Sequence, residues 1–120
     1  MDLVDEQLNN SKIIAVVGLS GDPERTSYRV TQYMQQQGYR IIPVNPMVDQ
    51  VLGEKSYPDL KSVPEPIDMV NVFRRSELVP PVIEEAIEVG VKYIWMQDGV
   101  ISTEWAAKAE AAGIPVIQDD

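Results

Sequence analysis

The stretch that decides the fold is Ile13-Ile14-Ala15-Val16-Val17-Gly18-Leu19-Ser20-Gly21-Asp22-Pro23. Residues 13–17 are consecutive apolar positions, a pattern typical of a strand buried on both faces of a parallel sheet. Gly18 follows at the point where the backbone has to bend, and it can approach a ligand closely because it has no Cβ. The stretch therefore predicts a strand that turns tightly towards a helix and can hold a phosphate.

Two starting points are open for that helix. Asp22 can serve as N-cap with Pro23 at the first helical position, or the helix can begin at Thr26 or Ser27. In either case the unpaired N–H groups of the first turn and the helix dipole favour an anion beside the turn.

The rest of the chain alternates between the two kinds of pattern. Helical spacing predicts helices over 24–37, 76–89 and from Ser102 to Gly113. Further strands are expected over 40–44, 67–73, 93–97 and 115–118, with a local irregularity at Pro43. Residues 47–66 are mixed in pattern, and we expect a short extended piece near 55–57 and one turn near Leu60.

Five strands that alternate with helices predict an α/β fold. It is a Rossmann-like, doubly wound, mostly parallel five-stranded sheet with helices on both faces. A length of 120 residues predicts one domain spanning residues 1–120. Ligands of such sheets bind beyond the carboxyl ends of the strands, near the point where the strand order reverses.

The composition excludes several kinds of catalytic and metal-binding site. The chain has no cysteine and no histidine, so disulfides, thiolate nucleophiles and histidine general bases are excluded. Ser20 and Ser27 have no histidine to activate them. We therefore expect no catalytic residues and no metal site, and a protein that is not an enzyme, although it can still be a subunit of one.

The charge and hydropathy of the chain limit the kinds of partner that it can bind. A formal net charge of −9 repels nucleic acid. No apolar run approaches the roughly 20 residues that span a bilayer, and residues 1–12 do not resemble a secretory signal. We expect a cytoplasmic protein that binds neither nucleic acid nor membranes. All its arginines lie between positions 25 and 75, where they can serve a small phosphorylated ligand or remain a solvated surface.

The first strand and its turn depart from the dinucleotide fingerprint. That fingerprint reads G-x-G-x-x-G, with an acid at the end of the second strand for the ribose hydroxyls. This chain has only Gly18 and Gly21 in the turn, and the second strand ends at Asn45. A neutral residue there favours a nucleotide with an extra phosphate on its ribose, or no nucleotide. The alternative is a tight turn without a ligand.

Two other strand ends carry candidate binding residues. Phe73, Arg74 and Arg75 follow the third strand, where arginine can bind phosphate and Phe73 can contact an adenine or a pantetheine arm. Trp95-Met96-Gln97 closes the fourth strand. The alternative is that Phe73, Trp95 and Met96 belong to the core and that the two arginines are solvated.

Taken together, these motifs resemble a known family. The motifs are Val16-Val17-Gly18-Leu19-Ser20, Pro23-Glu24-Arg25, Ser27-Tyr28-Arg29-Val30, Gly38-Tyr39-Arg40, Pro43-Val44-Asn45-Pro46, Gly53-Glu54, Tyr57, Val72-Phe73-Arg74 and Trp95-Met96-Gln97. Over residues 10–118 the chain resembles the small stand-alone CoA-binding proteins. Their Rossmann-like fold is that of the CoA-binding domain of the succinyl-CoA synthetase α subunit.

The resemblance implies a non-catalytic module that binds coenzyme A or an acyl-CoA. It implies a phosphate cradle of Gly18, Leu19, Ser20, Arg25 and Ser27, and a nucleotide border of Asn45, Pro46, Phe73, Arg74 and Arg75. Trp95, Met96 and Gln97 would line the pantetheine side. The synthetase's phosphohistidine chemistry is not implied, because this chain has no histidine.

The chain also departs from the family pattern. Family members commonly have a proline where this chain has Thr26, and they continue past the last strand, where this sequence stops at Asp120. Two alternatives remain open: an NAD(P)-binding domain of the oxidoreductase type, and a regulatory subunit that acts through a protein partner. The sequence leaves open the oligomeric state, the acyl group and the pathway.

Overall fold

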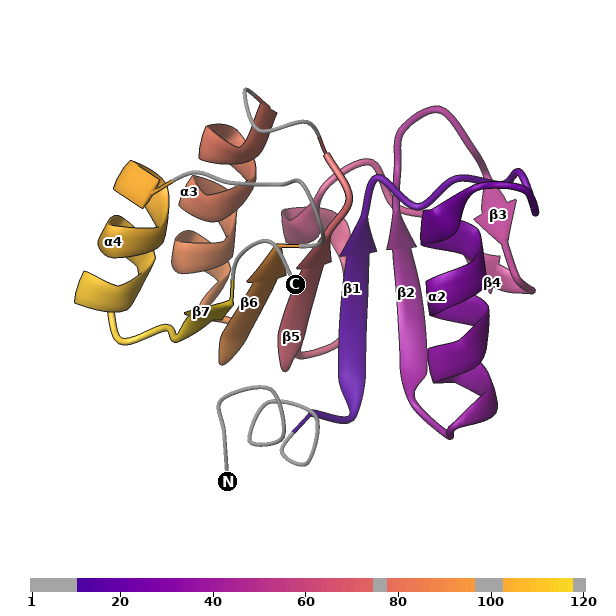
Figure 1. The fold of residues 1–120 in the computed structure, drawn as a ribbon, viewed down its shortest axis with the longest axis horizontal. Coiled ribbons are helices and arrows are strands. Elements are labelled where there is room, and N and C mark those ends of the chain that lie inside the picture. The colour runs from indigo at the N-terminus through magenta and orange to yellow at the C-terminus, as the bar shows by residue number, and fades with distance from the viewer. Residues whose placement is uncertain (1–10, 75–77, 97–102, 118–120) are drawn as a thin grey trace.

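A parallel five-stranded sheet forms the centre of the molecule in this computed structural model, which describes residues 11–74, 78–96 and 103–117 (Figure 1). The strand order is β2-β1-β5-β6-β7, and every neighbouring pair is parallel. The strands are β1 (Ile13–Val17), β2 (Arg40–Val44), β5 (Met69–Val72), β6 (Tyr93–Met96) and β7 (Val116–Ile117). This arrangement confirms the predicted fold class.

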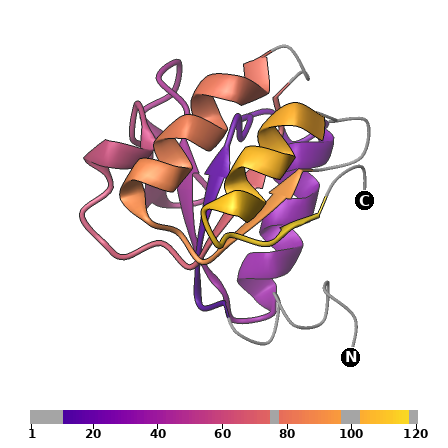
Figure 2. The same ribbon diagram turned by 90° about the vertical axis from the view of Figure 1, so that its left-hand side faces the viewer.

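Helices cover both faces of the sheet (Figures 1 and 2). Helix α2 (Thr26–Gln36) lies on one face, and helices α3 (Val79–Val89) and α4 (Thr103–Ala111) lie together on the other. Because side chains alternate along a strand, each β1 residue serves one face: Ile14 and Val16 pack in the cluster under α2, Ala15 and Val17 in the cluster under α3 and α4. Burial on both sides explains the unbroken apolar run of this strand.

The strand order reverses beside β1. The chain passes from β1 to β2 on one side and then crosses to β5 on the other side of β1. The helix after β1 and the helix after β5 lie on opposite faces, so the connections diverge at the carboxyl ends of these two strands. This divergence places a crevice there.

Helix α2 begins at the later of the two expected starting points. Thr26 is its first residue, and Arg25 is an N-cap with extended backbone and no side-chain hydrogen bond to the first turn. The Asp22 carboxylate accepts a hydrogen bond from Glu24 N (2.9 Å), and the Asp22 carbonyl accepts one from Arg25 N (3.0 Å). Asp22-Pro23 therefore forms a turn before the helix rather than its cap, and the expected start at Pro23 is wrong.

The region between β2 and β5 contains a hairpin that the sequence did not predict, although the extended piece expected near 55–57 overlaps its second strand, and Tyr57 forms a bridge to Val44. Strands β3 (Gln50–Val51) and β4 (Glu54–Lys55) pair antiparallel through a turn at Leu52-Gly53, where both residues have positive φ. The expected turn near Leu60 is a 3-10 helix, η1 (Leu60–Ser62), whose first N–H groups donate hydrogen bonds to the Glu85 carboxylate of α3.

The irregularity expected at Pro43 is absent. Pro43 pairs in regular register with Val16, without a break in β2, because β2 is an edge strand and its outer side needs no N–H at that position.

The remaining differences concern the ends of helices. Helix α3 begins at Val79, with Leu78 as its N-cap. The expected caps at Ser76 and Ser102 lie outside the described residues. Among the helices that the structure describes, none is both long and apolar enough to cross a membrane.

Candidate functional site

A cleft opens at the carboxyl end of the sheet, where the connections that follow β1 and β5 diverge. Its volume is about 510 Å³. The β1–α2 loop and the first residues of α2 supply one side, and the ends of β2 and β5 supply the other. The lining residues are Gly18, Ser20, Gly21, Glu24, Arg25, Thr26, Ser27, Asn45, Val48 and Phe73.

Gly18 forms the floor of this cleft through close backbone contacts. Its N–H donates to the Val44 carbonyl (3.0 Å), and Phe73 N–H donates to the neighbouring Val17 carbonyl (2.9 Å). A Cβ at Gly18 would lie 2.6 Å from the Phe73 carbonyl oxygen, and φ at Gly18 is +85°. Both observations require glycine, so Gly18 is explained by the approach of three strand ends, with or without a ligand.

The β1–α2 loop is held by its own hydroxyl groups. Ser20 N donates to Ser27 Oγ (3.0 Å), and Ser20 Oγ accepts from Asp22 N (3.0 Å). Ser27 is buried and belongs to the first turn of α2. These bonds hold the loop against the start of α2.

Asn45 joins the ends of β1 and β2. Its side-chain amide donates to the Leu19 carbonyl (2.9 Å), and its side-chain oxygen accepts from Met47 N (2.9 Å). Its backbone also bonds to Tyr57 and Ser56. The Asn45 side chain thus positions two loops, and it lines the cleft with both of its functional groups already engaged.

Unpaired positive charge borders the cleft. Arg25 is exposed in the cleft wall, and Arg74 is half-buried with Cδ close to Gly18. Within the described part of the chain neither guanidinium takes part in an ion pair, whereas Arg29 pairs with Glu24 at 3.4 Å. The first turn of α2 contains no acidic residue. An anion at this helix N-terminus would therefore meet N–H groups and guanidinium groups, together with the Glu24 carboxylate, whose charge is offset by Arg29.

A smaller cleft of about 230 Å³ lies on the other side of Arg74. Its walls are largely apolar and come from the ends of β1 and β2, from the segment before η1 and from the start of α3. The lining residues are Val17, Val44, Pro58, Asp59, Arg74, Leu78, Pro81, Val82 and Glu85. Arg74 lines this smaller cleft, and its Cδ would lie 3.3 Å from a Cβ at Gly18, a residue of the larger cleft.

The structure brings together part of the expected site. Six expected residues line the larger cleft: Gly18, Ser20, Arg25, Ser27, Asn45 and Phe73. Leu19 is fully buried and contributes its carbonyl to Asn45, and Pro46 is exposed beside the cleft without lining it. Arg75 and Gln97 lie outside the described residues.

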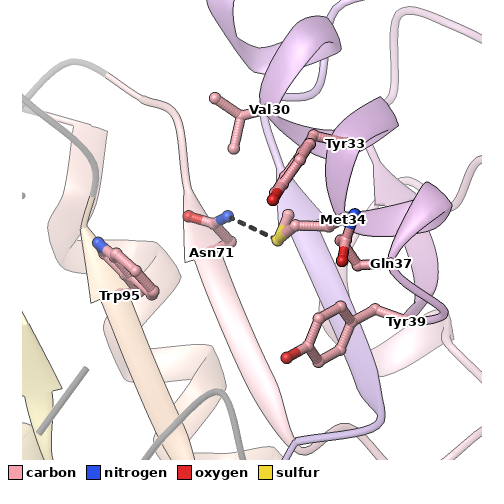
Figure 3. A pocket seen from close by; sticks show the side chains of 7 residues that line it. All are labelled: Val30, Tyr33, Met34, Gln37, Tyr39, Asn71 and Trp95. Carbon is pink, nitrogen blue, oxygen red and sulfur yellow. Dashed lines mark hydrogen bonds between the residues drawn. The ribbon is translucent and has the colours of Figure 1, made fainter. Parts of the chain in front are cut away.

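Trp95 and Met96 do not join this cleft. Met96 is fully buried in the core under α3 and α4, and Trp95 lines a separate groove beside α2 (Figure 3). Four further residues line the cleft and were not among the expected site residues: Gly21, Glu24, Thr26 and Val48. Val48 follows an Asn-Pro turn with no strand or helix pattern, so only its position shortly after Asn45 could have indicated it. Among the described residues no cluster of acidic side chains could hold a metal ion.

The fold and the cleft define a class of protein: a Rossmann-like α/β domain with an anion-favouring cleft at its strand-order reversal. The family model described as "CoA binding domain" matches residues 12–120. The chain therefore belongs to this CoA-binding domain family.

Its relatives include small proteins and domains of larger enzymes. The uncharacterized protein YneT of Bacillus subtilis is 48% identical over 97% of this chain and 86% of its own length. The α subunit of ADP-forming acetate–CoA ligase II of Pyrococcus furiosus is 33% identical, but the match covers 69% of this chain and only 18% of that subunit. A solved structure of a hypothetical protein from Pyrococcus horikoshii OT3 has a TM-score of 0.93 at 36% identity, and covers 97% of this chain and 82% of that one.

Proposed function

We propose that this chain binds coenzyme A or an acyl-CoA in the cleft between β1 and β5, as a module without catalytic residues of its own. The observation that carries the proposal is the coincidence of the family match with Arg25, which has no ion pair among the described residues, at the start of a helix whose first turn contains no acidic residue. The ligase relatives support it, because CoA ligases use CoA. The cytoplasmic location stays a prediction.

In this proposal the phosphates lie against the β1–α2 loop. The first turn of α2 offers N–H groups without side-chain caps, and Arg25 adds a charge that can form two parallel hydrogen bonds to a phosphate. Arg74 lies where it can reach the same ligand from the β5 side. Phe73 presents an aromatic side chain in the cleft wall, suited to an adenine or the pantetheine arm.

An NAD(P)-type domain is the weaker alternative. Recognition of a ribose diol uses a carboxylate at the end of the second strand. Here the residue is Asn45, whose amide donates to Leu19 and whose oxygen accepts from Met47. A ribose would have to displace one of these bonds, and the two loops would lose their connection.

Thermal unfolding with added ligands tests the proposal. Coenzyme A, 3′-dephospho-CoA and NAD are each added to the wild type, to Arg25→Ala and to Arg29→Ala. Arg29 is the matched control, because it is an exposed arginine one turn further along α2, already paired with Glu24. A ligand present at 100 times its Kd adds about 2.7 kcal/mol to the free energy of unfolding.

We expect coenzyme A to raise the midpoint of the wild type and of Arg29→Ala, and to raise that of Arg25→Ala much less. A larger rise with NAD than with coenzyme A would favour the NAD(P) alternative. No rise with any of the three ligands would overturn the proposal and favour a regulatory subunit that acts through a protein partner.

A further inference from the structure

Thr26, the first residue of α2, lines the larger cleft, and the fold makes little use of its polar groups. The residue is exposed. Within the described part of the chain, neither its N–H nor its hydroxyl group forms a hydrogen bond. Thr26 therefore presents two hydrogen-bond donors at the cleft that do not stabilise the fold.

The turn before α2 leaves these donors without a cap. The Asp22 carboxylate accepts a hydrogen bond from Glu24 N (2.9 Å), and the Asp22 carbonyl accepts one from Arg25 N (3.0 Å), so Asp22 serves the turn and not the helix. Arg25 is the N-cap and forms no side-chain hydrogen bond to the first turn. A helix start with uncapped N–H groups and no acidic residue in its first turn favours an anion.

A second, independent donor lies beside Thr26. Ser27 lines the same cleft, and only 7% of this residue is exposed. Its Oγ accepts a hydrogen bond from Ser20 N (3.0 Å), but its hydroxyl proton has no acceptor among the described residues. Buried polar groups are normally hydrogen-bonded, so the Ser27 proton lacks a partner that a ligand in the cleft can supply.

We propose that Thr26 binds a phosphate group of the coenzyme A ligand, with its N–H and its hydroxyl group as donors to phosphate oxygens. This inference rests on the proposed function and adds a binding residue to it. Ionised phosphate oxygens only accept hydrogen bonds, and the groups that Thr26 and Ser27 leave free are donors. Arg25 adds a positive charge beside them, so the ligand group and this wall of the cleft are complementary.

The acidic residue of the cleft does not cancel this attraction. Glu24 is the only acidic side chain among the described residues that line the cleft. Its carboxylate pairs with Arg29 (3.4 Å), and it belongs to the turn before α2 and not to the helix. Arg25 has no ion pair among the described residues, so its positive charge beside Thr26 is not offset in the same way.

Two substitutions remove the donors of Thr26 in turn. Thr26→Val removes the hydroxyl group and keeps the branched shape of the side chain, and Thr26→Pro removes both the hydroxyl group and the N–H. Proline suits the first position of a helix, and Arg25 has φ −82° and ψ 144°, the extended backbone that a residue before proline adopts. The unfolding midpoint of Thr26→Pro without ligand should therefore be no lower than that of the wild type, which separates lost binding from lost folding.

Calorimetry with coenzyme A and 3′-dephospho-CoA measures the effect. We expect Thr26→Val to bind coenzyme A about fivefold more weakly than the wild type and Thr26→Pro about fiftyfold more weakly, because hydrogen bonds to a charged group are lost one after the other. Equal losses for the two ligands assign the contact to the diphosphate, and a loss confined to coenzyme A assigns it to the 3′-phosphate. Thr103→Val is the matched control with wild-type affinity, since Thr103 is the exposed first residue of α4 and does not line the cleft.

Nuclear magnetic resonance of the isotope-labelled wild type reports on the N–H directly. Coenzyme A should shift the amide resonance of Thr26 downfield and leave that of Thr103 in place. Pantetheine, which has no phosphate group, should leave both in place.

The failures are distinguishable. A Thr26→Pro variant that binds coenzyme A as tightly as the wild type would overturn the role of Thr26 and leave the proposed function standing. A Thr26 amide resonance that shifts equally with pantetheine would also overturn a phosphate contact at this residue. If the wild type binds neither coenzyme A nor 3′-dephospho-CoA, both the role of Thr26 and the proposed function are overturned.

Discussion

The two ends of the parallel sheet use their charged residues in opposite ways. At the amino end, Arg40 bonds to Glu65 and Glu54, and Asp68 bonds to Lys92 and to the backbone of Lys12 and Ile13. At the carboxyl end, Ser27 and Asn45 join the loops through neutral groups and Arg29 pairs with Glu24, but Arg25 and Arg74 have no ion pair among the described residues. The charges of the amino end hold the fold together, whereas at the carboxyl end these two arginines add no ion pair to the described part of the fold.

Four substitutions test this contrast. Two weaken the neutral contacts of the carboxyl end, and two remove charges from the amino end. The expected loss of stability falls from the first to the last.

Gly18→Ala is expected to cause the largest loss. The added Cβ meets the Phe73 carbonyl at 2.6 Å and forces an alanine into φ +85°, so we expect the free energy of unfolding to fall by about 3 kcal/mol or more. Gly38→Ala is the control, because Gly38 also has positive φ (+97°) but no atom within 4 Å of its Cβ position. Urea unfolding of both variants measures the difference, and equal losses would contradict the role of the close contact.

Asn45→Asp should lower stability by about 2 kcal/mol, because Leu19 loses its donor and a carboxylate is placed beside the Leu19 carbonyl. The new charge should also weaken coenzyme A binding. Ser56→Ala is the control: it removes a bond of 2.9 Å to the same residue's backbone carbonyl and adds no charge. Ligand-induced shifts of the unfolding midpoint in the two variants separate the effects, and an unchanged shift in Asn45→Asp would count against phosphates in this cleft.

Asp68→Asn tests the amino end through pH. Burial acts to raise the pKa of the Asp68 carboxyl, but hydrogen bonds from Lys12 N and Ile13 N, together with Lys92, outweigh it and hold the pKa below its usual value. A lowered pKa in the folded state stabilises the protein above the unfolded-state pKa of about 3.9, and this contribution is lost as pH falls through the folded pKa.

We therefore expect Asp68→Asn to lose about 1 kcal/mol at neutral pH. The difference from the wild type should shrink below about pH 4, where the wild-type carboxyl takes up its proton. Urea unfolding between pH 7 and pH 3 measures it. A difference that stays constant over this range would show that the charge of Asp68 does not stabilise the fold.

Arg40→Gln should have the smallest effect. The pKa of Arg40 is raised by its hydrogen bond and charge interaction with Glu65, but the side chain is 47% exposed and water screens the pair. We expect a small loss that 1 M salt removes, since the Debye length is then about 3 Å. Unfolding midpoints with and without salt measure it, and a loss that persists in salt would contradict a screened surface interaction.

The sequence predicted the parallel core well and the short elements poorly. The carboxyl ends of β1 and β2 were predicted to the residue because the apolar runs of both strands end at Gly18 and Asn45. The β3–β4 hairpin was missed because its strands have two residues each and its turn places Leu52, a residue with no turn preference, at φ 53°.

The sequence predicted at which strand ends the site lies, but it did not predict into which face of the sheet each side chain points. Phe73 and Asn45 follow their strands directly and lie in the cleft. Trp95 and Met96 lie within the last residues of β6, where alternation sends them to opposite faces, Trp95 towards α2 and Met96 under α3 and α4. Alternation along a strand places a side chain only when the orientation of the sheet is known.

Pro43 should hinder the pairing of edge strand β2 with another protein chain. It lies on the outer side of edge strand β2, where it offers no N–H, and its carbonyl is already taken by Tyr57 N (3.0 Å). An extended chain from another molecule would therefore find no free backbone donor or acceptor of Pro43 with which to form a strand pair. Prolines and short covered edges discourage fibrous self-association, so this edge should stay inert during synthesis and at high concentration.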